Sequence, residues 1–262
     1  MADSVLSALI CMAFMATAIA VVMGTYLIAR RVLGTGRESD RAHEAAGAVG
    51  GRLALLYGLI LALVYAQELS DYKDIRAAVT EEAVAVADVF HDIRRYGGPE
   101  VRAVQQELLK YVSSVVDVEW DLLGRKIGLS QRGWEEWDNV YVRLLNLRPG
   151  TEKERYLANR MRDRITSIAR LRQTREASIR ESFANVFWPP ALIGLILLAI
   201  PLYVYRPSRS HIVLLSVFGA YSGVILFFIY AFSDPFQKPA RIEPVAFQKL
   251  QADFTVELAR MH

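Results

Sequence analysis

Two arginines in the polar part of the chain occupy positions where apolar side chains are expected. The apolar stripe of a long predicted helix runs from Leu157 to Ile168 at spacings of three and four, and Arg172 and Arg175 continue the same line. A buried guanidinium group needs a carboxylate partner, because an unpaired buried charge costs several kcal/mol. The placement therefore predicts buried ion pairs on this helix.

Glu82 and Glu119 are the expected partners, since each adjoins an apolar stripe on another predicted helix. Two interpretations are open. The four side chains form a structural ion-pair network that ties helices together, or they contribute a polar or anion-contacting surface along a central path.

Two more charged residues fall at the edges of apolar runs. Arg52 lies inside the second run once that run is long enough to cross a membrane. It either reaches the interface or faces a water-filled path or an anion. Asp234, with Pro235 and Phe236, follows the last run directly. It is either part of a structural turn or a carboxylate at a pore mouth.

Catalytic chemistry has no recognisable set of residues in this sequence. The four histidines are scattered, His43-Glu44 lacks the second histidine of a zinc helix, and Cys11 is the only cysteine. We expect no enzyme, no cofactor and no metal site. A net charge of +3 is too small to indicate a nucleic-acid partner.

Four apolar runs frame the polar region. Val5–Ala29 has 25 residues without charge, about 37 Å of helix, which is enough to cross a ~30 Å hydrocarbon layer. Leu53–Ala66 must borrow residues 45–51 to do so, and Val186–Tyr205 and Ile212–Phe232 complete the set. Together with 53% hydrophobic residues, these runs predict an integral membrane protein whose partner is the lipid bilayer.

The central region is predicted to be helical throughout. Residues 97–99 (Gly-Gly-Pro) break one helix, and a seven-residue apolar repeat from Val101 through Val118 to Leu122 predicts a packing seam. A shorter helix over 131–147 carries Trp134 and Trp137.

Other residues predict where the long helix and the helix of the third apolar run begin. Thr151 and Glu154 have the spacing of a capping box. Pro189 and Pro190 suit the first turn of the third apolar helix, and Pro201 should kink or end it.

The predicted fold class is all-α: four transmembrane helices, two N-terminal and two C-terminal, with a central soluble helical-bundle domain. The expected divisions are 1–67 for the first two transmembrane helices with a short basic cytoplasmic loop, 68–185 for the soluble helical domain, 186–233 for a transmembrane hairpin and 234–262 for a C-terminal tail.

Basic residues near the short loops predict the orientation. They are Arg30, Arg31, Arg37 and Arg41 after the first run, and Arg206 and Arg209 in the last hairpin. Because short cytoplasmic loops carry the excess of Lys and Arg, we place both loops in the cytoplasm and the central domain outside, in the periplasm of a bacterial inner membrane.

The order of several short motifs resembles the bestrophin-like family of bacterial four-span membrane proteins of unknown function. The residues that carry the likeness are Arg30-Arg31, His43 before the glycine-rich second span, Glu82-Ala83, Tyr111, Glu119-Trp120, Arg172, Arg175 and Asp234-Pro235-Phe236. The family tends to continue Pro-Phe with a glycine-containing turn, whereas this chain has Gln237-Lys238-Pro239.

Kinship with bestrophins implies a homo-pentameric anion channel with a cytoplasmic helical region. The arginine count places that region outside instead, and we follow the arginine count.

Two functions are predicted. The first is a homo-oligomeric ion channel, with anions as candidate cargo and Arg52, Glu119, Arg172 and Asp234 as its polar lining. The alternative is a non-conducting accessory or scaffold subunit of a larger membrane complex, docked on partner membrane subunits through exposed Trp134 and Trp137.

Overall fold

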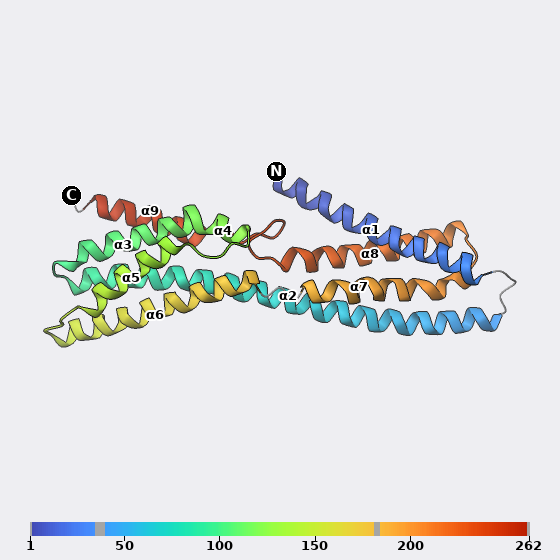
Figure 1. Cartoon of the computed structure of the whole chain (residues 1–262), viewed down its shortest axis with the longest axis horizontal. Helices are drawn as coiled ribbons and strands as arrows, with labels where there is room; N and C mark the ends of the chain where they lie inside the picture. Colours follow the sequence, from blue (N-terminus) through green and yellow to red (C-terminus); the bar gives the residue numbers. More distant parts are fainter. Residues whose placement is uncertain (1, 35–39, 181–183, 261–262) are drawn as a thin grey trace. The chain divides into compact units, whose positions relative to one another are not determined.

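The computed structural model describes residues 2–34, 40–180 and 184–260, and this part of the chain contains helices and connecting loops without a strand (Figure 1). It divides into two compact units. The span unit comprises residues 1–72, 182–234 and 238–240, and the bundle unit comprises 73–181, 235–237 and 241–262.

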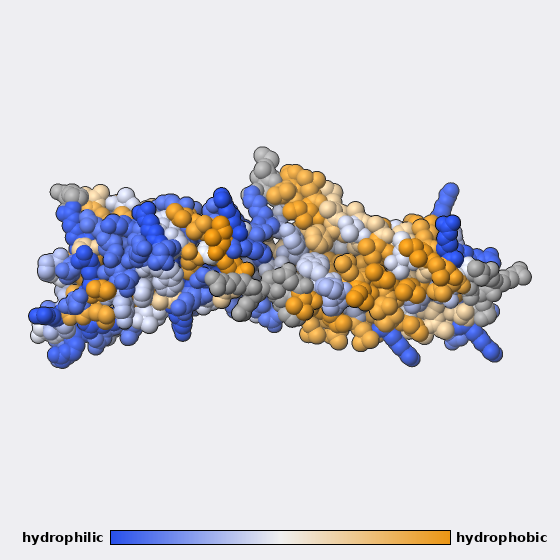
Figure 2. Space-filling model, in the orientation of Figure 1, coloured by the Kyte–Doolittle hydropathy of each residue, from blue (hydrophilic) through white to orange (hydrophobic). Residues whose placement is uncertain are grey.

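Four helices are long and apolar enough to cross a membrane: α1 (Ala2–Leu33), α2 (Asp40–Tyr96), α7 (Ala184–Ala199) with the short helix after it, and α8 (Arg209–Phe232). The visible face of the span unit is mostly apolar, whereas that of the bundle unit is mostly polar (Figure 2). The predicted all-helical class with four apolar spans is confirmed at this level.

Two glycines let α8 approach α1 at backbone distance. A Cβ atom at Gly219 would lie 2.8 Å from Ile19 Cα, and one at Gly223 would lie 2.6 Å from Met15 Cα. Small residues permit such close helix contacts within a bilayer. The apolar core of the span unit includes Val22, Tyr26, Leu61, Leu195 and Ile229.

The prolines of the third span behave in two ways. Pro189 and Pro190 lie inside α7, which begins at Ala184, so their predicted place in the first turn is wrong. The apolar run marks the lipid-compatible part of the helix rather than its start. Pro201 acts as predicted, because the α-helix ends at Ala199 and a 3₁₀ helix, η2 (Ile200–Val204), follows.

Helix α2 has 57 residues and contributes to both units, to the span unit up to Tyr72 and to the bundle unit from Lys73. It ends at Tyr96, and the next helix begins at Glu100, so the predicted break at residues 97–99 is confirmed.

The bundle unit also contains α3 (Glu100–Ser114), a π-helix η1 (Val115–Glu119), α4 (Trp120–Gly124), α5 (Gln131–Leu145), α6 (Glu152–Arg180) and α9 (Val245–Ala259). The capping box at the start of α6 is confirmed, since Glu154 N donates to Thr151 Oγ1 at 3.2 Å and Thr151 N donates to Glu154 Oε2 at 3.3 Å. Helix α9 forms within residues expected to be a C-terminal tail, and it packs against α3.

The π-helix changes which side chains of the seven-residue repeat face inward. Val115 is fully buried, but Val118 is 41% exposed, while Glu119 and Trp120 are buried. A π turn holds more residues than an α turn, so the residues after it rotate relative to the α-helical pattern. The prediction that Val118 belongs to the packing seam is therefore wrong.

Candidate functional site

Four charged side chains from three helices meet in the core of the bundle unit. Glu82 comes from α2, Glu119 from η1, and Arg172 and Arg175 from successive turns of α6. All four are 0% exposed. Together with Tyr111 of α3 they form what we call the charge cluster.

The ion pairs of the charge cluster are specific. Arg172 donates to Glu119 at two points, Nη2 to Oε1 at 2.7 Å and Nη1 to Oε2 at 3.2 Å. Arg175 Nη2 donates to Glu119 Oε2 at 2.9 Å and to Glu82 Oε1 at 3.3 Å. Tyr111 donates its hydroxyl hydrogen to Glu82 Oε1. Glu119 is thus shared by both arginines.

Aromatic rings cover both guanidinium groups. The Arg172 guanidinium carbon lies 4.5 Å from the centre of the Trp134 ring and 5.1 Å from that of Tyr111. The Arg175 carbon lies 5.4 Å from the Trp120 ring and 5.8 Å from the Phe247 ring. Such cation–π contacts each contribute about 0.5–2 kcal/mol, and they exclude water from the ion pairs.

These contacts correct the expectation that two tryptophans are exposed for docking. Trp134 is half-buried over Arg172. Trp137 is also half-buried, and its Nε1 donates to the carbonyl oxygen of Ile165 at 2.9 Å. Both side chains therefore serve the packing of α5 on α6.

Gly133 provides the space that the Glu119 carboxylate needs. A Cβ atom at this position would lie 2.4 Å from Glu119 Oε1 and 3.0 Å from Arg172 Nη2. Just before α5, the backbone N–H of Ser130 donates to Glu119 Oε1 at 3.2 Å. The start of α5 is thus shaped around this carboxylate.

Burial changes the protonation equilibria of the charge cluster. Burial raises the pKa of Glu82, although Arg175 and the Tyr111 hydroxyl oppose that rise. Burial also raises the pKa of Tyr111 well above 10, with the Glu82 carboxylate adding to the rise. For Arg172, burial alone would lower the pKa, but the neighbouring Tyr111 and Glu119 raise it overall, so this side chain stays charged.

Of the six predicted site residues, the structure brings together Glu82, Glu119, Arg172 and Arg175. The other two belong to the span unit: Arg52 is exposed on α2, and Asp234 is half-buried after the end of α8. The predicted site omits Gly133 and the aromatic walls. The sequence could have indicated Tyr111 as a member of the site, because it is the one residue in the apolar repeat that carries a hydroxyl group.

The charge cluster offers no arrangement for metal binding. Within the described residues, no group of three or more His, Cys, Asp or Glu side chains is placed to hold a metal ion. Its carboxylates already accept hydrogen bonds from guanidinium and hydroxyl groups, so its geometry is suited to fixing helices against one another.

Comparisons with known proteins give a family and a fold. The model of the bestrophin-like domain matches residues 16–247. No curated protein matches the chain. Two crystal structures of mutants of a bacterial bestrophin homologue from Klebsiella pneumoniae are similar at 12% identity. The first has a TM-score of 0.67 and covers 95% of this chain and 98% of the other. The second has a TM-score of 0.67 and covers 94% and 97%.

A third mutant of that homologue is similar at 13% identity and a TM-score of 0.64, covering 92% of this chain and 97% of the other. At such low identities the structures show a shared fold.

Proposed function

The chain belongs to the bestrophin-like family, and from this premise we propose that it is a membrane ion channel assembled from several copies, with anions as candidate cargo. The observation that carries the proposal is the family match, which spans residues 16–247 and therefore covers more than half of the first span, the other three spans and the bundle unit up to the start of α9. Solved bestrophin homologues share its fold over nearly the whole chain.

The surface of the spans supports assembly within a bilayer. Large apolar side chains on α2 are strongly exposed, among them Leu55 at 76% and Leu63 at 63%. Exposed apolar areas of this kind mark contacts with lipid or with other proteins.

A row of small residues on α2 supports self-association through this helix. Gly50, Ala54, Gly58, Ala62 and Ala66 recur at every fourth position, and the last four are exposed. A Cβ atom at Gly50 or Gly58 would meet no atom within 4 Å. Small residues at spacing four allow helices of neighbouring chains to pack closely in a membrane. We assign this row, the α2 stripe, to the contact between copies.

The polar lining of the ion path is assigned to Arg52 and Asp234. Both lie in the span unit, at positions where charge is costly unless it faces water or a partner. Glu119 and Arg172 were also predicted to line the path, but both are fully enclosed by their own chain. Their geometry favours the ion-pair network instead.

The orientation follows from arginines at the short loops. Arg30 and Arg31 lie in the last turn of α1, Arg209 is the first residue of α8, and Arg206 precedes that helix. Arg37 lies outside the described residues. The excess of basic residues supports a cytoplasmic position for these loops and a periplasmic position for the bundle unit.

The experiment compares Gly58→Leu with a matched control, Gly24→Leu in α1, where a Cβ would also meet no atom within 4 Å. At both positions the first added carbon meets no atom of its own chain, so we expect both variants to fold. We expect the wild type and Gly24→Leu to purify as assemblies of several 29.5 kDa chains that carry chloride across vesicles. Gly58→Leu should lose both properties. A monomeric wild type, or one that moves no ions, would refute the proposal.

A further inference from the structure

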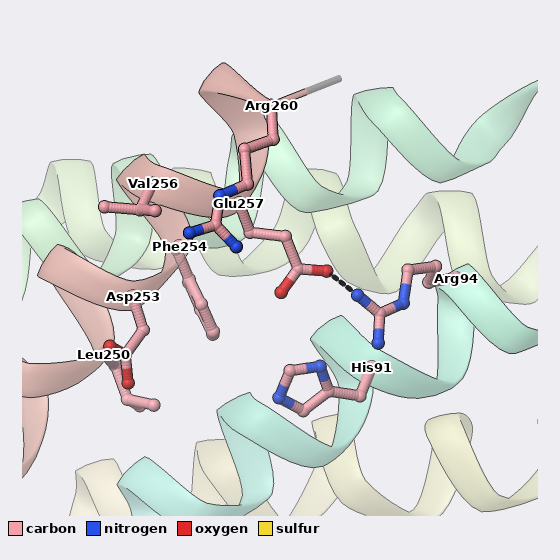
Figure 3. A pocket seen from close by; sticks show the side chains of 8 residues that line it. All are labelled: His91, Arg94, Leu250, Asp253, Phe254, Val256, Glu257 and Arg260. Carbon is pink, nitrogen blue, oxygen red and sulfur yellow. Dashed lines mark hydrogen bonds and ion pairs between the residues drawn. The ribbon is translucent and has the colours of Figure 1, made fainter.

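A hollow of about 640 Å³ lies within the bundle unit between α2 and α9 (Figure 3). Its volume is in the range of small-molecule sites. The apolar part of its wall rests on Phe254, whose ring stacks on Phe90 of α2 with 3.6 Å between centres and 6° between planes. Besides Phe254, the residues that line the hollow and could contact a ligand are His91, Arg94, Leu250, Asp253, Glu257 and Arg260.

One carboxylate and one guanidinium group of the hollow are available to a ligand. Arg94 donates to Glu257, so these two satisfy each other across the two helices (Figure 3). Asp253 and Arg260 are exposed, and within the described residues neither forms an ion pair. Asp253 and Arg260 lie on the same side of α9 as Glu257. They are seven positions apart, which corresponds to a separation of about 10 Å along the helix axis.

His91 adds a polar group that can both donate and accept. Its Nδ1 is buried and has no hydrogen-bond partner among the described residues, and Figure 3 shows the ring directed toward the space in front of α9. A neutral imidazole has one N–H donor and one nitrogen acceptor. A peptide group has an N–H donor and a C=O acceptor, so it can form one hydrogen bond to such a ring in either direction.

We propose that this hollow binds a small zwitterion of the short-peptide type. Its ammonium group contacts Asp253, its carboxylate contacts Arg260, its peptide group bonds to His91, and an apolar side chain packs on Leu250 and Phe254. The lining holds two acids and two guanidinium groups, so a ligand of one charge sign is attracted by one pair and repelled by the other. A zwitterion satisfies both. Binding of such a ligand is independent of ion conduction.

The test is calorimetric titration of the dipeptide Leu-Leu into the full chain in detergent, beside its N-acetylated and C-amidated forms. Asp253→Asn should lower the affinity for Leu-Leu at least about tenfold. It should leave the affinity for the N-acetylated form unchanged, because that form lacks the ammonium group. Arg260→Gln should lower the affinity for Leu-Leu and leave the affinity for the C-amidated form unchanged. Asp138→Asn, an exposed acid on α5, is the control and should bind as the wild type does.

Both altered side chains are exposed, so the variants should unfold at the wild-type temperature. Absence of Leu-Leu binding to the wild type at millimolar concentration would overturn the proposal. Binding that both variants leave unchanged would overturn it as well.

Discussion

Arg172 and Glu119 form a two-point ion pair in which each terminal guanidinium nitrogen contacts a different carboxylate oxygen, at 2.7 and 3.2 Å, with neither side chain exposed. Two-point arginine–carboxylate pairs are among the stronger protein hydrogen bonds. A buried pair recovers its desolvation cost only when the remaining polar atoms also find partners. Here Arg175 and the backbone N–H of Ser130 supply two of them.

Loss of the shared carboxylate charge should be the most damaging conservative change in the bundle unit. Glu119→Gln leaves two buried guanidinium groups with weakened pairing, so we expect the free energy of unfolding to fall by about 3–5 kcal/mol. Chemical unfolding of the full chain in detergent measures the loss. Glu135→Gln, on the exposed side of α5, serves as the control and should change stability by less than about 0.5 kcal/mol. A small effect of Glu119→Gln would contradict the geometry.

A single methyl group at Gly133 should disturb the same ion pair from the side of α5. The Cβ of Gly133→Ala would lie 2.4 Å from Glu119 Oε1, so we expect a loss of about 1–3 kcal/mol from forced displacement. Gly150→Ala is the matched control, because its Cβ would lie at an ordinary 3.6 Å from Glu154 Oε2. Equal stability of the two variants would show that the carboxylate does not lie where the structure places it.

The contribution of Glu82 to the stability of the bundle unit should decrease as the pH rises. Burial raises its pKa above the ordinary 4.5, so folding favours the protonated form. The stabilisation from this group is complete below pH 4.5 and is lost as the pH rises through the raised pKa. Glu82→Gln, which resembles the protonated acid, should therefore unfold at a higher temperature than the wild type at pH 8, and at a similar temperature at pH 4.5.

The exposed neighbour Glu81 provides the control for that comparison. Thermal unfolding of Glu81→Gln should follow the wild type at both pH values. If Glu82→Gln instead destabilises the chain at pH 8, the ionised carboxylate is the favoured form.

The π-helix predicts opposite outcomes for two valines three residues apart. Val115→Asn places an amide in the core, where Val115 is fully buried, and should cost roughly 3 kcal/mol. Val118→Asn changes a side chain that is 41% exposed and should stay within about 0.5 kcal/mol. Equal losses of unfolding free energy in the two variants would indicate that both valines face the core, as in a regular seven-residue repeat, and would argue against the π turn.

Local signals in the sequence were sufficient for the spans and for several helix ends. The uncharged run from Val5 to Ala29 has no alternative use in a water-soluble helix, and the Thr151–Glu154 capping box and the break at 97–99 depend only on neighbouring residues. The two arginines of α6 were also informative, because a charge in an apolar stripe requires a buried partner.

Features that depend on tertiary packing were not predictable in the same way. The apolar repeat continues through Val118 without any sign of the π turn that rotates it outward. Trp134 looked like a docking residue because its position over Arg172 depends on how α5 packs against α6. Phe247 comes from a helix in the expected tail, and no local pattern connects it to Arg175.

The most direct test of ion conduction is the reversal potential of currents through the purified protein in a planar bilayer under a tenfold potassium chloride gradient. We expect currents that reverse near the equilibrium potential of chloride. Conductance indistinguishable from that of a protein-free bilayer would contradict the channel. Reversal near the potassium potential would contradict its anion selectivity.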